Sequence, residues 1–452
     1  MNIAAGYYSS LEKQYRSKLL KPEEAISVVP ADATFITFGC YAGCPPKLSE
    51  LFCNAVRSNH FKDVVGIYIF RADDSILKNY LDERVLEQVQ IYSPFMGGGF
   101  RQVIDMTVQN KALLKPQYIS GHFSSLEKGI ICQHLVPDAH LFQVAPMDRH
   151  GYFSLGVDGS YSIPMAKVAK KKILEVNPNM PRTFGDAFIH VSQADAIIEY
   201  KSDLTLIGNK PATAEDFKIA EHITPYIEDR SCVQLGIGSV PNAVGEFLKA
   251  RNDLGVHTEL LSDALMKLIL SGNVTNKYKS IRRHHTVFNV AVMSQQDLYM
   301  PINDNPTMEC YPASFVNNPD IIAQIDDMVS INSFVEIDLL GQVASESIGW
   351  KQITGTGGQV DYVRGASRSK NGKAFLASHA TTKDGRLSKI VPRLNNIVTT
   401  PRTDVQYVVT EHGAENLLGM SNTERAKALI RIAAPQFRDE LTEEAKAMRI
   451  IR

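Results

Sequence analysis

Cysteine is scarce in this chain, and its spacing excludes several kinds of site. There are 6 cysteines among 452 residues, and none forms a C-x-x-C pair, so the pattern indicates neither a redox dithiol nor a disulfide framework. Cys40 and Cys44 are spaced as metal ligands could be, but no second pair accompanies them, and we expect no metal site. Cys132 and Cys232 stand in apolar runs, which favours buried free thiols. We therefore expect a reduced, metal-free protein of the cytoplasm.

An excess of charge and long apolar runs are also missing. The 48 basic residues balance 49 acidic ones, for a net charge of −1, so electrostatics favours neither nucleic acid nor an anionic membrane as a partner. No run approaches the roughly 18–20 apolar residues that span a bilayer. Residues 1–20 lack the basic start and apolar core of a signal peptide. We expect no nucleic-acid partner and no membrane partner.

Several catalytic signatures are absent as well. The chain has no G-x-S-x-G sequence, which argues against an ordinary serine hydrolase. The loop 236-GIGSVP-241 lacks the third glycine and the distal acid of a dinucleotide-binding fingerprint. It also lacks the Gly-Lys-Ser/Thr sequence of a phosphate-binding P-loop.

Short apolar runs alternate with helical patterns along nearly the whole chain. Such runs between amphipathic helices predict an α/β fold, with mostly parallel sheets flanked by helices. A length of 452 residues exceeds what one hydrophobic core usually holds, so we expect more than one domain. The clearest expected strands are 34–39, 65–70, 139–146, 233–238, 287–293 and 405–410.

An internal repeat divides the chain into two halves. Residues 23–39 match residues 220–236, and each segment has a helical pattern, an acidic turn and a strand that ends in glycine. The turn and charged residues of 201–217 interrupt the apolar rhythm. We therefore predict two related open α/β domains, residues 1–205 and residues 206–452.

The repeat singles out one acidic residue. When Gly66 is aligned with Gly255, Phe70 of the first half takes the place of Glu259 in 253-DLGVHTELLSD-263. The symmetry of the fold therefore does not require an acid at this position. Glu259 is either a structural carboxylate, capping a helix or paired with Lys279 or Arg282, or a nucleophile that attacks an activated carbonyl.

Two glycine-rich segments offer backbone groups to such a carboxylate. The loop GIGSVP precedes a helical pattern, where glycines either make a plain turn or present N–H groups to a developing oxyanion. The segment 354-TGTGGQVDYVRGA-366 is a second flexible backbone platform.

Taken together, blocks along almost the whole chain resemble the acetyl-CoA hydrolase/transferase family, the class I CoA-transferases. The blocks stand in the order of that family: QVAPMDRHGYFSLGV, EVNPNMPRTFG, GIGSVPNAV, DLGVHTELLSD, ILSGNVTNKYK, INSFVEIDLLGQVASESIG, GTGGQVDYVRGA and VTEHGAENLLGMSNTERAKALIRIAAPQFRDEL. One departure is Leu418, where the family usually has arginine, and another is the sequence 378-SHATTKDGRLSK-389.

The resemblance implies roles for particular residues. It makes Glu259 the catalytic nucleophile, and it assigns the loop at 236–240 to CoA binding and the oxyanion hole. It also brings Asn332 and the second glycine loop to the CoA thioester from the other side. The positions expected to bind CoA are Gly236, Ile237, Gly238, Ser239, Val240, Asn332, Gly355, Gly357 and Gly358. Arg182, Lys279 and Arg364 are the cations that we expect near the anionic ends of CoA.

The activity implied is CoA transfer from acetyl-CoA or butyryl-CoA to an acid such as 4-hydroxybutyrate, butyrate or acetate. The family mechanism is ping-pong, through a γ-glutamyl-CoA thioester on Glu259, with no permanently bound cofactor. The alternatives are an acetyl-CoA hydrolase that uses the same glutamate, and a succinyl-CoA or itaconate CoA-transferase. A homodimer or larger homo-oligomer is expected.

Overall fold

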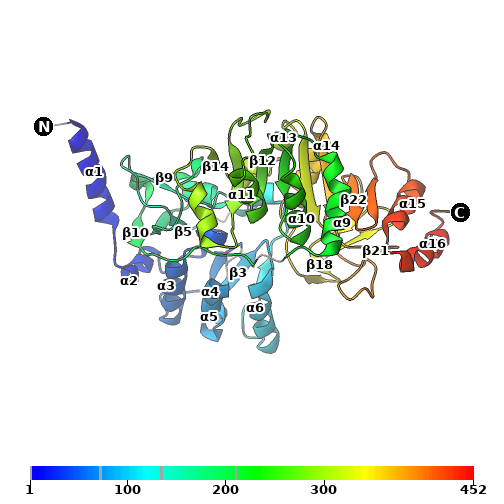
Figure 1. Cartoon of the computed structure of the whole chain (residues 1–452). Helices are drawn as coiled ribbons and strands as arrows, with labels where there is room; N and C mark the ends of the chain where they lie inside the picture. The colour runs from blue at the N-terminus through cyan, green and yellow to red at the C-terminus, as the bar shows by residue number, and fades with distance from the viewer. Residues whose placement is uncertain (1–2, 71–73, 133–135, 209–210) are drawn as a thin grey trace. The chain divides into compact units, whose positions relative to one another are not determined.

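The structure, a computed structural model, describes residues 3–70, 74–132, 136–208 and 211–452. These residues form two mainly parallel sheets, of seven and nine strands, with helices along them (Figure 1). The predicted α/β class is confirmed, and each of the six expected strands has its counterpart. None of the described helices is both long and apolar enough to cross a bilayer.

The chain divides into two compact units. Unit 1 comprises residues 1–121, 125–207 and 287–314, and unit 2 comprises residues 122–124, 208–286 and 315–452. Residues 287–314 thus belong to unit 1, although they lie within the second of the predicted domains, 1–205 and 206–452. Those bounds stay a prediction.

Unit 1 is built on the seven-stranded sheet, in the order β10-β7-β5-β1-β2-β3-β4, and all neighbours in this order are parallel. Its strands are β1 (Phe35–Phe38), β2 (Val65–Tyr68), β3 (Val89–Ser93), β4 (Gln117–Tyr118), β5 (Ala139–Val144), β7 (Lys171–Val176) and β10 (Ala196–Glu199). Smaller strands are β6 (Tyr152–Ser154), β8 (Phe184–Gly185), β9 (Phe188–His190), β13 (Thr286–Ala291) and β14 (Met308–Cys310). The helices of this part of the chain are α1 (Ile3–Lys18), α2 (Pro22–Ala25), α3 (Pro46–Arg57), α4 (Asp74–Leu77), α5 (Glu83–Gln88), α6 (Gly98–Gln109), α7 (Leu126–Cys132) and α8 (Ser162–Val168).

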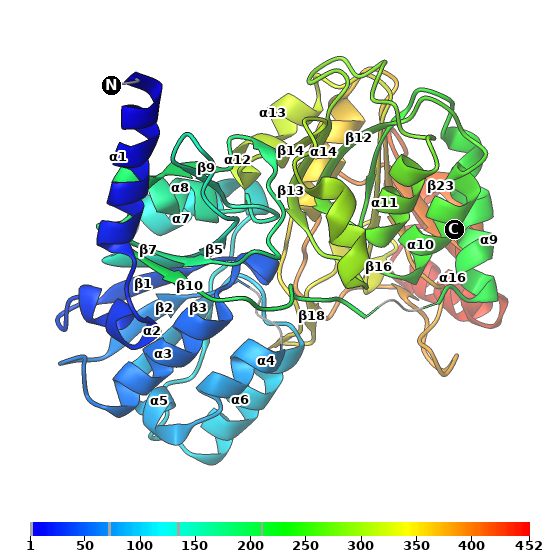
Figure 2. The ribbon, with the colours of Figure 1, turned by 60° about the vertical axis from the view of Figure 1, so that its left-hand side comes forward.

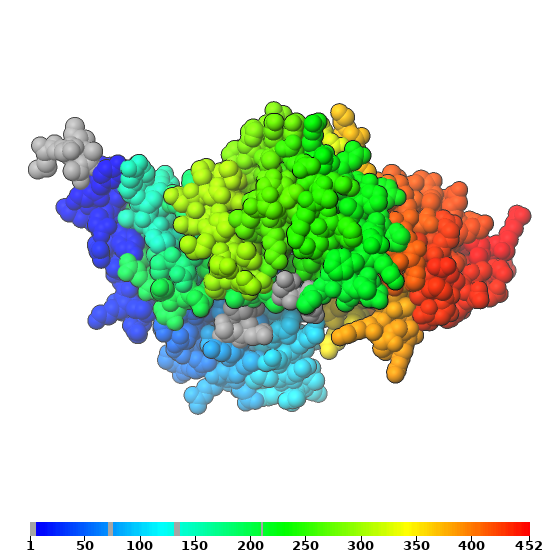
Figure 3. Space-filling model, in the orientation of Figure 1, coloured from blue at the N-terminus to red at the C-terminus, as the bar shows by residue number. Residues whose placement is uncertain are grey.

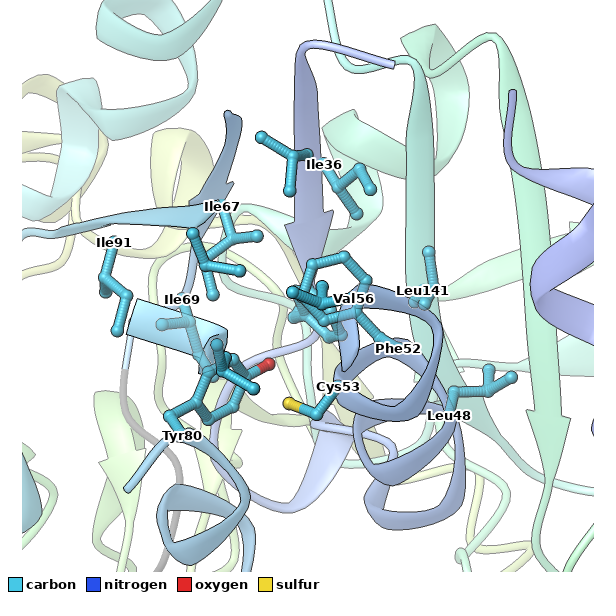
Figure 4. Packing of buried hydrophobic residues seen from close by; sticks show 14 of the residues in the cluster. Ile36, Leu48, Phe52, Cys53, Val56, Ile67, Ile69, Tyr80, Ile91 and Leu141 are labelled. Atoms are coloured by element: carbon cyan, nitrogen blue, oxygen red, sulfur yellow. The ribbon is translucent and has the colours of Figure 1, made fainter. Parts of the chain in front are cut away.

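The core of unit 1 lies between this sheet and the helices beside it. Helices α3, α5 and α6 lie along one face of β1, β2 and β3 (Figure 2). Figure 4 shows Ile36 and Ile67 from these strands beside Phe52 and Val56 of α3, and Ile91 of the same core cluster farther along the sheet. All five side chains are buried, because a parallel sheet covered by helices has little contact with water.

In unit 2 the strand order is β23-β22-β20-β15-β11-β12, and only the edge strand β23 runs antiparallel to its neighbour. These strands are β11 (Cys232–Leu235), β12 (Gly255–Leu261), β15 (Met328–Ser333), β20 (Lys373–Ala377), β22 (Tyr407–Thr410) and β23 (Gly413–Asn416). Short strands are β16 (Glu336–Asp338), β17 (Val343–Ala344), β18 (Ser347–Ile348), β19 (Lys351–Gln352) and β21 (Ile390–Val391). The helices are α9 (Ala214–Ile223), α10 (Ser239–Leu248), α11 (Asp263–Leu270), α13 (Pro319–Ile322), α14 (Gln359–Arg368), α15 (Asn422–Ile432) and α16 (Arg438–Ala447), and α12 (Ala313–Val316) spans the junction of the two units.

Helices α9 and α10 pack against each other in unit 2. In the space-filling view, the green atoms of this part of the chain form a continuous surface (Figure 3). Strand β11 of the same unit is buried at every position.

The two sheets repeat each other in order and in register. In unit 1, β1 lies between β2 and β5, and in unit 2, β11 lies between β12 and β15. Phe35 pairs with Gly66 in the first sheet, and Cys232 pairs with Gly255 in the second, which is the alignment that the sequence repeat predicts. This register places Phe70 of unit 1 at the position of Glu259 in unit 2.

Candidate functional site

Glu259 lies in β12 and accepts one hydrogen bond from a side chain. The Asn317 Nδ2 donates to Glu259 Oε2 over 2.6 Å, and the amide nitrogen must face the carboxylate because a carboxylate only accepts. Neither Lys279 nor Arg282 pairs with Glu259 among the described residues. The structural role considered for Glu259 as an ion-pair partner of these two residues is therefore wrong.

The ionisation of Glu259 is resisted by its surroundings. Burial raises the pKa of the Glu259 carboxyl to about 7, and the nearby Asp361 raises it as well. The hydrogen bond from Asn317 and the backbone N–H of Gly358 act in the opposite direction. A carboxylate with such a pKa is ionised in a large fraction at neutral pH and is only weakly solvated, which suits a nucleophile.

The second glycine loop comes within contact distance of this carboxylate. A Cβ atom on Gly358 would stand 1.9 Å from Glu259 Oε2, and one on Gly357 would stand 3.8 Å from Glu259 Oε1. A side chain at position 358 would therefore displace the Glu259 carboxylate, and Gly357 has a φ of +54° in the left-handed region. The structure therefore brings Gly357 and Gly358 directly to Glu259, and their predicted contact with CoA stays a prediction.

A buried carboxylate organises the rest of this loop. Glu346 accepts hydrogen bonds from Gln352 Nε2 at 2.8 Å, from Thr399 Oγ1 at 3.0 Å and from Thr356 Oγ1 at 3.3 Å. Its backbone carbonyl accepts from Ile353 N at 2.8 Å and from Thr354 N at 3.2 Å. Gly355, also predicted for the site, is buried within this bonded segment.

The start of α14 is fixed by residues 122–124, which belong to unit 2. Phe123 N donates to Gly357 O over 3.1 Å, and Ser124 donates to Asp361 from its backbone N at 3.0 Å and from its Oγ at 2.7 Å. Burial raises the pKa of Asp361 above its ordinary value, although the bonds from Ser124 oppose this. The buried Asp361 in turn raises the pKa of the half-buried Glu259.

The first glycine loop joins β11 to α10. Gly238 has φ +135° and ψ −179°, a conformation essentially restricted to glycine, and it caps the helix that begins at Ser239. The N–H groups at a helix start have no acceptor within the helix. Those of Gly238, Ser239 and Val240 stand at the start of α10, with Ile237 exposed beside them, and their role as an oxyanion or CoA site stays a prediction.

One expectation for this loop is corrected. The N–H of Gly236 donates to Ile331 O over 2.9 Å, because it continues the parallel pairing of β11 with β15. Gly236 cannot give that hydrogen to an oxyanion at the same time.

Asn332, the remaining predicted site residue, is engaged in an amide pair. It exchanges hydrogen bonds with Gln234 of β11, at 3.3 Å from Gln234 Nε2 and 3.2 Å from Asn332 Nδ2. The structure thus places it near the end of β15 beside Gly236, without a contact to Glu259.

The cations suggested for CoA have other partners. Lys279 is buried, and its Nζ donates to Val256 O at 2.8 Å and His285 O at 2.6 Å, so its side chain is engaged within the fold. Arg182 pairs with Asp148 over 2.6 Å and Arg364 pairs with Asp404 over 2.8 Å.

Sequence reasoning missed Asn317 and Glu346. Asn317 is followed by Asn318 and Pro319, a sequence typical of a helix start, and Asn318 indeed caps α13. That pattern predicts the cap, but it does not predict that Asn317 contacts Glu259. Cys40, Cys44, Cys53, Cys232 and Cys310 are buried and form no disulfide with one another, whereas the side chain of Cys132 lies outside the described part of the chain. No group of three or more potential metal ligands gathers within the described residues.

Comparison with protein families matches both halves of the chain. Residues 6–207 match the acetyl-CoA hydrolase/transferase N-terminal domain, and residues 294–445 match the acetyl-CoA hydrolase/transferase C-terminal domain. Glu259 and the loop at 236–240 lie between the two matched ranges.

Relatives and solved structures cover nearly the full length. The 4-hydroxybutyrate coenzyme A transferase of Clostridium kluyveri is 39% identical over 437 residues, which are 96% of this chain and 99% of the relative. The butyryl-CoA:acetate CoA-transferase of Anaerostipes caccae is 35% identical, with 98% and 99% covered. The crystal structure of RipA from Yersinia pestis superposes with a TM-score of 0.93 at 38% identity, over 98% of this chain and 100% of RipA.

The resemblance drawn from the sequence blocks is thereby confirmed. The chain is similar to CoA-transferases over nearly its full length, and it matches both domains of one family. It also shares the fold of RipA. The chain belongs to the acetyl-CoA hydrolase/transferase family and is a CoA-transferase.

Proposed function

We propose that this enzyme moves CoA from acetyl-CoA or butyryl-CoA to a small carboxylic acid such as 4-hydroxybutyrate, butyrate or acetate, with Glu259 as the nucleophile. The observation that carries the proposal is a carboxylate of raised pKa that is held by Asn317 and lies against the glycine loop at Gly357 and Gly358. The named activities of the C. kluyveri and A. caccae relatives support the choice of acids.

The first half-reaction transfers CoA to the enzyme. A Glu259 oxygen attacks the carbonyl carbon of the donor thioester, the C–S bond breaks, and CoA leaves as a thiolate beside a mixed anhydride. The thiolate then attacks the γ-carbonyl carbon of Glu259 and breaks its bond to the bridging oxygen. The donor acid departs as a carboxylate, and a γ-glutamyl-CoA thioester remains.

The second half-reaction is the reverse with a different acid. The acceptor carboxylate attacks the glutamyl thioester, CoA leaves again as a thiolate, and a new anhydride forms. The thiolate attacks the acyl carbonyl of the acceptor, which releases the new acyl-CoA and restores the Glu259 carboxylate. Exclusion of water is required throughout, since hydrolysis of either intermediate would waste the thioester.

Backbone N–H groups stabilise each tetrahedral oxyanion in this scheme. The candidates are Gly238, Ser239 and Val240 at the start of α10, in place of the donor expected from Gly236. One such donor typically contributes about 3–4 kcal/mol to stabilisation of the transition state. A ping-pong pattern of initial rates is expected when donor and acceptor concentrations are varied.

An acceptor screen tests the proposal and distinguishes its alternatives. Acetyl-CoA, butyryl-CoA and succinyl-CoA are each incubated with acetate, butyrate, 4-hydroxybutyrate, succinate and itaconate, and new acyl-CoA is measured. The proposal requires a new acyl-CoA from acetyl-CoA or butyryl-CoA with one of the first three acids. Free CoA released equally without any acceptor would instead indicate an acetyl-CoA hydrolase, and a strict need for succinate or itaconate would indicate the other transferase.

Two further features belong to the proposal. We place the enzyme in the cytoplasm, which the reduced thiols of Cys53 and Cys232 support. We also propose a homodimer or larger homo-oligomer, which light scattering of the purified protein measures directly.

A further inference from the structure

A buried carboxylate joins two helix starts in unit 2. Asp216 of α9 is buried, and its Oδ2 accepts the backbone N–H of Thr213 at 2.8 Å, which caps its own helix. Its Oδ1 accepts the hydroxyl of Ser239, the first residue of α10, at 3.0 Å. Helices α9 and α10 lie side by side (Figure 2), so Asp216 fixes the beginning of one helix against the beginning of the other.

A histidine from a third segment also bonds to this carboxylate. His379 follows β20, and its Nε2 donates to Asp216 Oδ1 over 2.8 Å, because a carboxylate only accepts. The next residue, Ala380, donates its backbone N–H to Glu411 Oε2 at 2.8 Å, so this segment is anchored at the end of β22. The side chain of His379 is 32% exposed and that of Asp216 is 0% exposed. His379 thus reaches a buried carboxylate from the surface.

Asp216 is held in its ionised form. Burial resists ionisation, but three hydrogen bonds outweigh burial and keep the pKa of the Asp216 carboxyl below its ordinary value. These bonds come from Thr213, His379 and Ser239. A negative charge therefore stands beside the start of α10, where the proposed function needs the positive end of the helix for an oxyanion. A carboxylate at that place opposes an anionic ligand unless a cation offsets its charge.

Two basic side chains interact with Asp216. Protonated His379 forms an ion pair with it at 2.8 Å. Lys389 attracts it as well, but burial lowers the pKa of Lys389, and its Nζ donates to Ser378 Oγ at 2.9 Å. Of the two bases, only His379 bonds to Asp216 in the described part of the chain. Three further acids act on these bases: Glu215, Glu336 and Glu411.

We propose that His379 is a positioning residue for CoA transfer, which pairs with Asp216 and so keeps the start of α10 fixed and able to accept the anionic groups of the acyl-CoA. The inference rests on the proposed function, since it concerns the same predicted oxyanion site. His379 lies in the segment 378–389, where the sequence departs from the family pattern. The role is therefore not one that the family resemblance implies.

Substitutions at both members of the pair separate charge from bulk. His379→Gln keeps an N–H donor without a charge, and His379→Lys keeps a positive charge. Asp216→Asn combined with His379→Gln removes the charge that needs an offset, and the hydroxyl of Ser239 and the Gln amide can each accept from the new amide. His412→Gln is the matched control, because His412 is 29% exposed and stands 3.6 Å from Glu411 instead of pairing with Asp216.

The readout is kcat/KM for the acyl-CoA donor that the acceptor screen identifies, and thermal melting establishes that each variant is folded. His379→Gln should lower kcat/KM at least about tenfold, because the charge of Asp216 then opposes the developing oxyanion. His379→Lys and His412→Gln should stay within about threefold of wild type. Adding Asp216→Asn to His379→Gln should restore kcat/KM to within about threefold of wild type, a recovery that a merely structural role of His379 does not produce.

Two results overturn the inference. One is a folded His379→Gln enzyme with wild-type kcat/KM, and the other is a loss that Asp216→Asn does not recover. If His379→Gln does not fold, His379→Lys decides, and a loss of about tenfold in that variant overturns the inference.

Failure of the proposed function gives a different result. If wild-type protein transfers CoA and the His379 variants match it, only the positioning role is wrong. If wild-type protein yields neither new acyl-CoA nor a borohydride-reducible Glu259, the nucleophile itself is wrong, and the role of His379 falls with it.

Discussion

At the scale of the residue, a carboxylate that attacks a thioester has to be ionised, and the surroundings of Glu259 resist its ionisation. Burial raises the pKa of Glu259 to about 7, so the protonated, unreactive form predominates at lower pH. We predict that kcat/KM rises with pH through an inflection near pH 7 and is level above it. Initial rates from pH 5 to pH 9 check this, and a profile that is flat from pH 5 upward would contradict it.

The same shift has a consequence for stability. Because the pKa of Glu259 is above its ordinary value of 4.5 in the folded chain, the folded state binds more protons than the unfolded state between pH 4.5 and pH 7. Glu259 therefore lowers stability as the pH rises through this window, and the full cost is present above pH 7. We predict that Glu259→Gln raises the free energy of unfolding at pH 8 by roughly 1–3 kcal/mol, after allowance for partial exposure.

Urea unfolding of wild type and Glu259→Gln at pH 8 and pH 4.5 measures this difference. The gain should shrink toward zero at pH 4.5, where Glu259 is protonated in the folded chain and half protonated in the unfolded chain. An equal gain at both pH values would show that packing, and not the charge, is responsible.

At the scale of the element, the loop before α14 has no space for a side chain. A Cβ at position 358 would collide with Glu259 Oε2 at 1.9 Å and with Asn317 Nδ2 at 2.0 Å. We predict that Gly358→Ala lowers kcat by at least about 100-fold, since a displacement of the nucleophile of about 1 Å has that effect. Gly98→Ala is the control, because Gly98 starts α6 in open space, and it should keep wild-type kcat.

The repeat makes a second prediction at this scale. Phe70 is buried among Tyr41 and Phe95, with ring centroids at 5.7 Å and 5.6 Å. The loop after β1 is already occupied, since Cys40 N donates to the buried Asp158 over 2.7 Å. Phe70→Glu combined with Glu259→Ala should therefore create no activity, and Phe70→Glu alone should destabilise the fold by at least about 3 kcal/mol. Restored transfer in the double variant would overturn the account of the two halves.

At the scale of the whole molecule, the sequence predicts what depends on pattern along the chain. The strands are found from apolar runs, and the equivalence of Phe70 with Glu259 is found from the repeat and confirmed by the register of β1 with β2 and β11 with β12. What depends on pairing across the sheet is not predicted. The N–H of Gly236 donates to a carbonyl of β15, and the Nζ of Lys279 donates to two backbone carbonyls. Neither contact can be inferred from the residues next to it in the sequence.

The partners of the site come from distant loops for the same reason. Asn317 reaches Glu259 across 58 positions of the chain, and Glu346 gathers Thr356 and Thr399 from two further segments. From the sequence alone, each of these residues is expected in a loop. Which loops come into contact is decided only when the sheet has folded. The position of Glu259 in β12, beside a glycine loop, could thus be predicted, whereas its contact with Asn317 could not.

The central claim is that CoA becomes attached to Glu259, and one measurement tests it most directly. The enzyme is incubated with acetyl-CoA or butyryl-CoA and no acceptor, treated with borohydride, digested and analysed by peptide mass spectrometry. The account predicts that Glu259 is reduced to the corresponding alcohol, because a thioester or anhydride is reduced and a carboxylate is not. Transfer activity in the same preparation with Glu259 unmodified after this treatment would contradict it.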